Sequence, residues 1–244
     1  MEQVAKVKTK QNGVVRHSAT RRVKGPGRLM TRSIFEKAPE YVAPRLLGKL
    51  LVRWTKAGPI AGRIVETEAY LGPHNIPPDP AAHSHRGPTP RNQVLWGPAA
   101  HAYVYAIYGR YFCMNVTCEP NGKAGCILLR ALEPVGVFST AQMAKNRGLE
   151  PDSPLKQFAS GPGRLCLALD LTRKLHNGLD LLDPESPLQL RDDGFATQEV
   201  GITARIGLTH AVDLPLRFLL AGHACASGTR KWNQALVGRR VFSD

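Results

Sequence analysis

The sequence predicts a single mixed domain of the α+β class, in which strands pair into an antiparallel sheet and short helices surround it. A length of 244 residues, of which 43% are apolar, is enough for one large domain with a substantial core. Strand-like and helix-like stretches neither alternate regularly nor fall into two blocks, and no long structureless gap interrupts residues 35–220. These observations favour one domain over two.

The N-terminal 34 residues are expected to stand apart from this domain as a basic, flexible tail. They carry nine Lys and Arg against one acidic residue, few large apolar side chains and a Gly-Pro-Gly at 25–27. Such a segment cannot bury enough surface to order itself. Two interpretations are open. The segment is either a solvated tail, or an arm that contacts DNA or carries a nuclear-localisation signal. The domain itself is predicted over residues 35–244.

Apolar spacing and turn residues predict the elements of this domain. Residues 35–47 have helical spacing and end at Gly48, which favours the left-handed position after a helix. Residues 111–118 alternate apolar and polar side chains, which is typical of a half-buried strand. Ser139 and Gln142 form a capping box that opens a further helix. The other expected elements are strands at 49–54, 60–70, 102–108, 126–132, 200–208 and 214–221, a helix opening at 153–154 and a short helix at 164–169.

Charge and cysteine content narrow the class of partner. A net charge of +14 makes nucleic acid the leading candidate, because a strongly positive surface attracts polyanions. Five cysteines without a Cys-x-x-Cys indicate a reducing compartment and argue against structural zinc. His83 and His85 form a pair without a third ligand at a recognisable spacing, so no metal is predicted. No stretch is typical of a membrane span or a secretory signal, so we expect no membrane partner.

Two carboxylates lie on one face of an expected strand. Within residues 64–71 the alternation places Glu66, Glu68 and Tyr70 together. Either the carboxylates face solvent, or one of them lies in a pocket as a general base beside a cation. Arg130 is a candidate for that cation, because it is the charged residue of an otherwise apolar strand and needs a partner there.

Four of the six tyrosines fall within residues 103–111. Tyr103 and Tyr105 would share one strand face, and Tyr108 would point to the other directly before a Gly-Arg turn. One interpretation is a sheet core rich in aromatic residues. The other is a hairpin tip whose Tyr108 enters DNA between bases while Arg110 holds a phosphate.

Several motifs together resemble the alkyladenine (3-methyladenine) DNA glycosylase family, over roughly residues 35–220. They are GRIVETEAYLGP at 62–73, AHS at 82–84, TPRN at 89–92, the tyrosine-rich stretch 103–115, LLRALEP at 128–134, SGP at 160–162, LC at 165–166, ARIG at 204–207 and PLRF at 215–218. The resemblance implies one domain with a curved, mainly antiparallel sheet and flanking short helices. It also implies that the protein uses no organic cofactor and no metal.

The resemblance further implies a role for each matched residue. Glu68 would activate the water that displaces a damaged base, and Arg130 would orient that water. Asn115 would exclude guanine by crowding its exocyclic amine. The rest of the base pocket would be formed by Tyr70, His83 and Tyr105, and Tyr108 would fill the gap left in the duplex. The DNA backbone would be held by Arg110 and Arg91.

The predicted function is therefore a monomeric DNA repair glycosylase without lyase activity. It would flip and hydrolytically excise alkylated purines, and also deaminated or etheno purines, from duplex DNA and leave an abasic site. The alternative is a non-catalytic module that binds damaged DNA. Glu68 argues for the enzyme, since a pure binder has no need for a charge that repels phosphate. We expect an intracellular, DNA-associated protein, in the cytoplasm or nucleoid of a bacterium, with a nucleus or organelle as the alternative.

Three features depart from the family pattern. The loop at 74–80 is longer than usual and precedes His83, which bears on where that histidine lies. Arg110 stands where an uncharged residue is common. The tail at 1–34 has no counterpart in the family.

Overall fold

The computed structural model describes residues 25–196, 199–234 and 238–240. Most of the predicted tail, residues 1–24, lies outside this range. Within its described part, Arg28–Leu29 forms a short strand, β1, that pairs with the strand β7 (Leu188–Asp192). The described chain contains no helix with both the length and the apolar character needed to cross a bilayer.

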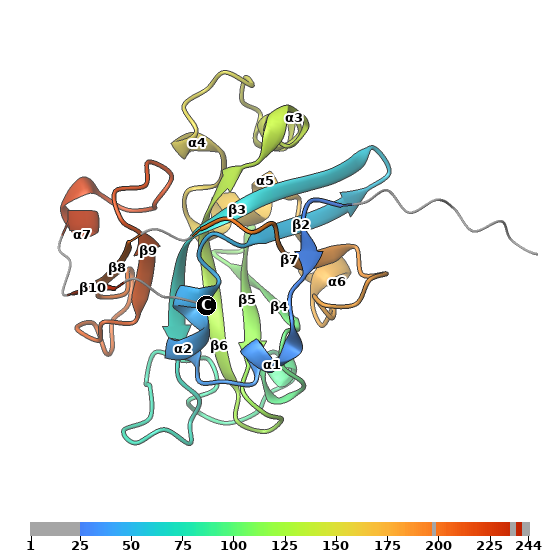
Figure 1. The fold of residues 1–244 in the computed structure, drawn as a ribbon. Coiled ribbons are helices and arrows are strands. Elements are labelled where there is room, and N and C mark those ends of the chain that lie inside the picture. Colours follow the sequence, from blue (N-terminus) through green and yellow to red (C-terminus); the bar gives the residue numbers. More distant parts are fainter. Residues whose placement is uncertain (1–24, 197–198, 235–237, 241–244) are drawn as a thin grey trace, which may run out of the picture.

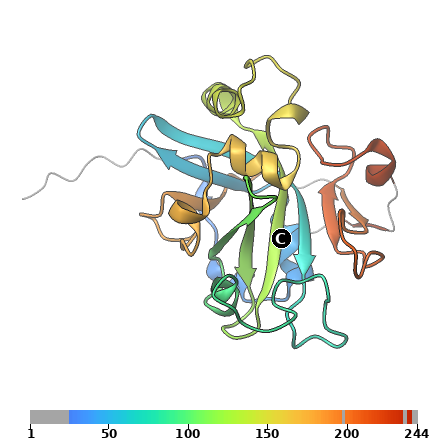
Figure 2. The ribbon, with the colours of Figure 1, turned by 180° about the vertical axis from the view of Figure 1, so that it is seen from behind.

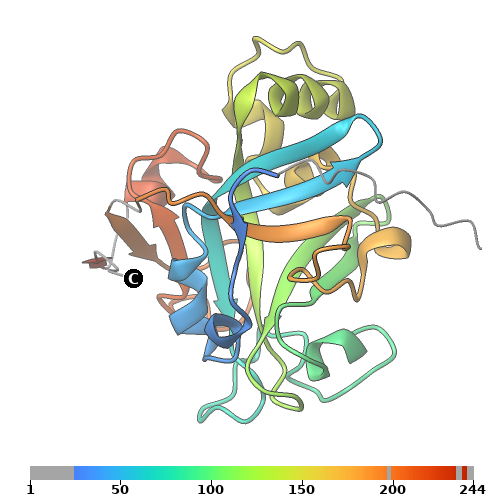
Figure 3. The same ribbon diagram turned by 45° about the vertical axis from the view of Figure 1, so that its right-hand side comes forward.

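One branched antiparallel sheet organises the molecule (Figure 1). Its main path runs in the order β1-β7-β2-β3-β6-β5-β4, and β9, β8 and β10 branch from β3 at the side of the molecule where α7 lies. Figure 2 shows the β4–β5 hairpin from behind, and Figure 3 shows β7 alongside β2. The strands are β2 (Leu50–Thr55), β3 (Gly58–Tyr70), β4 (Ala102–Ile107), β5 (Tyr111–Cys118), β6 (Gly125–Pro134), β7 (Leu188–Asp192), β8 (Val200–Thr203), β9 (Arg217–Leu220) and β10 (Gly238–Arg240). The prediction of a mixed fold with a mainly antiparallel sheet is confirmed.

The helices are short and lie around the sheet. The predicted single helix at 35–47 is wrong, because the chain forms α1 up to Phe35 and starts α2 at Pro39. Proline has no amide hydrogen, and the first turn of a helix does not need one, so Pro39 favours the start of a new helix. A second proline, Pro44, lies inside this short helix. Gly48 does take the predicted left-handed conformation, with φ of 81°. The helices are α1 (Arg32–Phe35), α2 (Pro39–Arg45), η1 (Gln93–Trp96), α3 (Gly136–Arg147), α4 (Lys156–Ala159), α5 (Pro162–Ala168), α6 (Arg173–His176) and α7 (Arg230–Gln234).

Further boundaries differ from the predictions. The capping box is wrong: α3 begins at Gly136, and the Ser139 hydroxyl accepts a hydrogen bond from the amide of Ala61 across to β3. The helix expected to open at 153–154 begins at Lys156. β8 ends at Thr203 rather than 208, and β9 covers 217–220 of the expected 214–221. β1 and β7 were not predicted, because strands of two and five residues are too short to show a clear alternation of apolar and polar side chains.

Both faces of the central strands are covered. The main core lies on one face, where buried side chains of α2, α3 and α5 join those of the strands. A smaller cluster lies on the other face, formed by Leu95, Tyr103, Tyr105, Cys113, Ala124, Cys126 and Leu128. The strand predicted at 111–118 is present, but the prediction that it is half-buried is wrong. From Cys113 onward both of its faces are buried, because the second face meets this smaller cluster. All five cysteines are buried free thiols.

Candidate active site

The register of four strands brings those predicted site residues that lie on strands onto one face of the sheet, the face of the smaller cluster. Glu68 on β3 pairs with Leu128 on β6, and Leu128 pairs with Asn115 on β5. Asn115 in turn pairs with Tyr103 on β4. Directly paired residues of an antiparallel sheet share one face, so these four side chains form a row across β3, β6, β5 and β4. Tyr70 and Tyr105 belong to the neighbouring rows on the same face.

Glu68 is fully buried and accepts three hydrogen bonds. Nη1 of Arg130 lies 3.2 Å from Oε2, and the Tyr70 hydroxyl donates to the same oxygen at 2.9 Å. The backbone amide of Ile206 donates to Oε1 at 2.8 Å. Burial and the charge of Glu68 raise the pKa of Tyr70, so its phenol keeps the proton that it donates. The alternative in which the carboxylates face solvent is wrong, because neither has any exposed surface.

Glu66 is the centre of the same buried ion-pair network, because it also binds Arg130. It accepts from Nε of Arg130 at 2.8 Å and from Nε of Arg217 at 2.7 Å. The Ser227 amide and hydroxyl also donate to it, at 2.5 and 2.8 Å. Burial raises the pKa of Glu66, but the two guanidinium groups outweigh burial and hold it below its usual value. Glu66 is therefore ionised at neutral pH.

A local irregularity in β3 gives Arg130 access to both carboxylates. The pairing of β3 with β6 shifts on both sides of Glu66, so that Glu66 faces Ala131 and Thr67 faces Leu129. Arg130 lies between these two pairs on β6. Such a bulge changes the direction of a side chain and increases the local twist of a strand. The carboxylate charges outweigh the effect of burial and raise the pKa of Arg130, so it stays a cation.

Three rings pack together beside this network. The Tyr103 and Tyr105 rings stack with centroids 5.1 Å apart, and the His83 ring meets Tyr105 edge-on at 4.5 Å. Nδ1 of His83 lies 3.1 Å from the Tyr103 hydroxyl. The Arg91 guanidinium is 5.7 Å from the Tyr105 ring centroid. Desolvation and the charge of Arg91 lower the pKa of His83, so this imidazole is neutral at pH 7.

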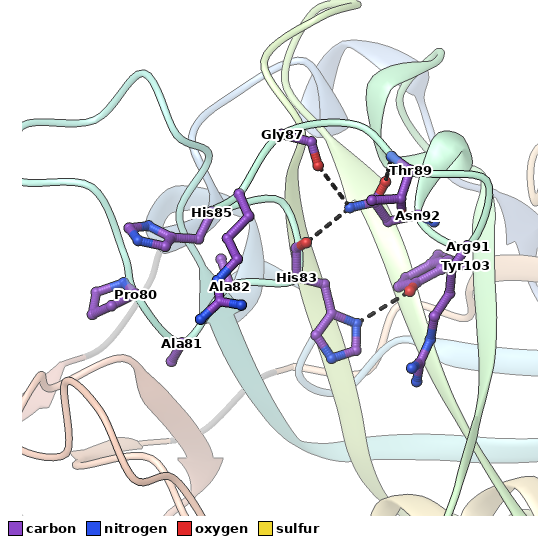
Figure 4. A pocket seen from close by; sticks show the side chains of 11 residues that line it. Pro80, Ala81, Ala82, His83, His85, Gly87, Thr89, Arg91, Asn92 and Tyr103 are labelled. Carbon is purple, nitrogen blue, oxygen red and sulfur yellow. Dashed lines mark hydrogen bonds between the residues drawn. The ribbon is translucent and has the colours of Figure 1, made fainter.

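A pocket of about 370 Å³ opens between the loop 80–92 and Tyr103 (Figure 4). His83 and Arg91 are the predicted site residues that line it, whereas Glu68 does not. The Asn92 amide group shapes the loop by donating to the backbone carbonyls of His83 at 2.8 Å and Gly87 at 3.1 Å. The open hollow therefore lies at the β4 end of the row, and its lining includes neither Glu68 nor the residues that hold this carboxylate.

The hairpin tip and the Asn115 side chain complete the predicted set. Tyr108 is 90% exposed and has φ of 48°, a left-handed conformation in the β4–β5 turn. Arg110 is exposed beside it. Asn115 is buried, and its amide nitrogen donates to Sγ of Cys126 at 3.5 Å. Its carbonyl oxygen has no hydrogen-bond partner within the described chain.

Four buried side chains that support this site had no role in the prediction from the sequence. Asp79 and Arg205 form a fully buried ion pair at 2.6 Å that ties the loop after β3 to the segment after β8. The Arg205 guanidinium also lies 4.6 Å from the Tyr70 ring centroid. Arg217 and Ser227 bind Glu66. The signal for Arg217 was available, because it stands as a lone charge in the apolar stretch LPLRFLL, as Arg130 does in its own strand.

The described residues hold no group of three or more His, Cys, Asp or Glu side chains placed to bind a metal ion.

Comparisons with known proteins agree with the resemblance in the sequence. A model of the methylpurine-DNA glycosylase family matches residues 33–224. A protein of Koribacter versatilis is 52% identical over 201 residues, which cover 82% of this chain and 94% of that protein. Proteins of Rhodopseudomonas palustris and Methanoculleus marisnigri are each 46% identical, over 79% and 78% of this chain and 84% and 94% of their own lengths. All three bear the name "Putative 3-methyladenine DNA glycosylase".

Proposed function

Because the chain belongs to the methylpurine-DNA glycosylase family, we propose that it is a DNA repair glycosylase that excises alkylated purines of the 3-methyladenine type from duplex DNA. It acts as a monomer without metal or organic cofactor, leaves an abasic site and has no lyase activity. Deaminated and etheno purines belong to its substrate range. The observation that carries this proposal is the fully buried Glu68, held by Arg130 on a sheet face covered with aromatic rings.

In the proposed reaction Glu68 is the general base. Water gives its proton to the Glu68 carboxylate while its oxygen bonds to C1′ of the flipped nucleotide. The bond from C1′ to the base nitrogen breaks, and its electron pair leaves with the base. Arg130 donates to Glu68 and orients the water. A positioned general base typically contributes about 10²- to 10⁴-fold in rate.

The aromatic residues hold the flipped base in this proposal. Tyr70, His83 and Tyr105 surround it, and Asn115 crowds the exocyclic amine of guanine. Flipping costs a few kcal/mol, and stacking on aromatic side chains returns roughly 1–3 kcal/mol per base. Because the two nearly cancel, a damaged or weakly paired base is extruded more readily than a normal one.

The hairpin tip and the arginines bind the duplex around the flipped base. Tyr108 fills the vacated position in the stack, which suits an aromatic ring that is 90% exposed at the end of a hairpin. Arg91 and Arg110, both exposed, contact phosphates. The net charge of +14 supplies the long-range attraction.

The test uses methylated duplex and hypoxanthine-containing duplex, followed by alkaline cleavage of abasic sites. The wild-type protein should give strand scission after alkali and none before it. Glu68→Gln should bind DNA normally and lose about 100-fold or more in rate, while Glu150→Gln, which alters an exposed carboxylate, should act as wild type. Near-normal base release by Glu68→Gln would refute the assigned base. Binding of damaged duplex without any scission by the wild type would instead favour the non-catalytic binding module.

A further inference from the structure

The segment after residue 224, where the family-model match ends, reaches back to the buried carboxylates. It contains Ser227 and the helix α7, and each contributes a side chain to the ion-pair network. Ser227 is buried, and Asn233 is half-buried.

The Ser227 hydroxyl bridges the two charges that flank it. It donates to Oε1 of Glu66 at 2.8 Å and accepts from Nη2 of Arg130 at 3.1 Å. Arg130 then has each of its three nitrogens engaged: Nε on Glu66, Nη1 on Glu68 and Nη2 on Ser227. Three contacts in different directions fix both the position and the plane of a guanidinium group.

Asn233 on α7 supports the same network one step further out. Its Oδ1 accepts from Nη2 of Arg217 at 2.7 Å, and Arg217 also donates to the backbone carbonyl of Ser227 at 3.1 Å. Arg217 is fully buried and pairs with Glu66. The contacts therefore run from α7 through Arg217 and Glu66 to Arg130.

We propose that Ser227 is a positioning residue for base excision, and that Asn233 supports it from α7. This inference rests on the proposed function. The hydroxyl of Ser227 keeps the Arg130 guanidinium turned so that Nη1 meets Glu68, and Glu68 in turn stays aligned with the attacking water. Without the hydroxyl, Nη2 of Arg130 loses its partner in a buried site, and the guanidinium rotates toward another acceptor. A small misplacement of this kind can cost about 100-fold in rate.

The primary test is Ser227→Ala in the full chain, measured as single-turnover excision from methylated duplex at saturating protein. We expect the rate to fall about 10- to 100-fold while the dissociation constant for the duplex changes less than about twofold, because Ser227 does not contact DNA in this proposal. Ser227→Thr retains the hydroxyl and should recover most of the rate. Ser186→Ala is the matched control, since it removes a different buried serine hydroxyl, one that donates to the carbonyl of Leu188 at 2.9 Å. That control should lower stability without changing the excision rate.

A second pair of variants tests the proposal if Ser227→Ala does not fold. Asn233→Ala should slow excision, and Asn233→Asp, which keeps an acceptor for Arg217, should restore it. A wild-type excision rate in Ser227→Ala would overturn the inference and leave the proposed function intact. If Ser227→Ala does not fold, a wild-type excision rate in Asn233→Ala would have the same meaning. An inactive wild-type protein would overturn the proposed function and this inference with it.

Discussion

Replacing Glu66 by glutamine should destabilise the protein strongly, although the two side chains have nearly the same shape. The change removes the negative charge that faces Arg130 and Arg217, whose guanidinium groups lie 2.8 and 2.7 Å from the same carboxylate oxygen. Among the described residues Arg217 then has no ion-pair partner, and its side chain is fully buried. Removing one member of a buried ion pair typically costs about 3–5 kcal/mol. For a domain of this size each kcal/mol shifts Tm by roughly 2–4 °C, so we expect Tm to fall by about 6–20 °C.

Thermal unfolding followed by circular dichroism measures this change directly. The control is Glu150→Gln, because Glu150 is exposed and its substitution should move the unfolding free energy by no more than about 0.5 kcal/mol. A Tm for Glu66→Gln within about 2 °C of the wild type would contradict the reasoning, since it would mean that the two arginines do not need the charge.

The pH dependence of stability gives the same prediction a second readout. The two guanidinium groups hold the pKa of Glu66 in the folded protein below its ordinary value of 4.5, against the opposing effect of burial. A carboxyl whose folded-state pKa is depressed adds stability above its unfolded pKa, and this stability is lost as pH falls through the folded value. The difference in stability between wild type and Glu66→Gln should therefore be largest above about pH 5 and shrink below it. A difference that stayed constant down to low pH would rule out this electrostatic origin.

Three further predictions concern the duplex-binding surface and the loop over the site. Tyr108→Ala should leave Tm unchanged, because the side chain is exposed, and should weaken binding of lesion-containing duplex roughly 5- to 150-fold in a titration; unchanged affinity would exclude the wedge role. Arg91→Ala and Arg110→Ala should each reduce the slope of log affinity against log salt by about 1, and an unaltered slope would mean that the residue holds no phosphate. Gly72→Ala should lower stability by about 1–3 kcal/mol in urea unfolding, because its new methyl group would collide with the carbonyl of Lys123, whereas Gly163→Ala, with its nearest neighbour at 3.7 Å, should be neutral or stabilising.

The part of the fold that the sequence could predict is the part with strong local signals. The hairpin formed by β4 and β5 follows from the tyrosine-rich run, the Gly109 turn and the alternation after Tyr111, and its observed strands match the expected ones within a residue. Helix starts were less predictable. Ser139 has the right neighbours for a cap, but tertiary contact with the amide of Ala61 decides its position instead. In β3 and β6 nearly every side chain is buried, so the sequence pattern alone could not show that the carboxylates face a second buried cluster rather than solvent.

For the candidate site, the sequence could predict residues on the central strands but not the partners that hold them. One of two open alternatives placed one of the carboxylates in a pocket with Arg130 as its candidate cation, because a charge in an apolar strand needs a partner. Arg217 and Ser227 lie 151 and 161 residues from Glu66 along the chain. Their contact depends on how β9 branches from β3, which is a property of the sheet topology and leaves no periodic signal in the sequence.

Glu66 and Glu68 lie two residues apart on one strand, yet their surroundings separate their roles. Glu66 accepts from two arginines, and protonating it would leave Arg217 without a negative partner in the buried network. Glu68 shares Arg130 with Glu66, and its other two donors, a backbone amide and the Tyr70 hydroxyl, are neutral. A proton taken up by Glu68 therefore leaves both arginines facing the charge of Glu66. Of the two carboxylates, Glu68 is the one that is not required as the sole negative partner of a buried arginine among the described residues, and this suits the role of general base in the proposed reaction.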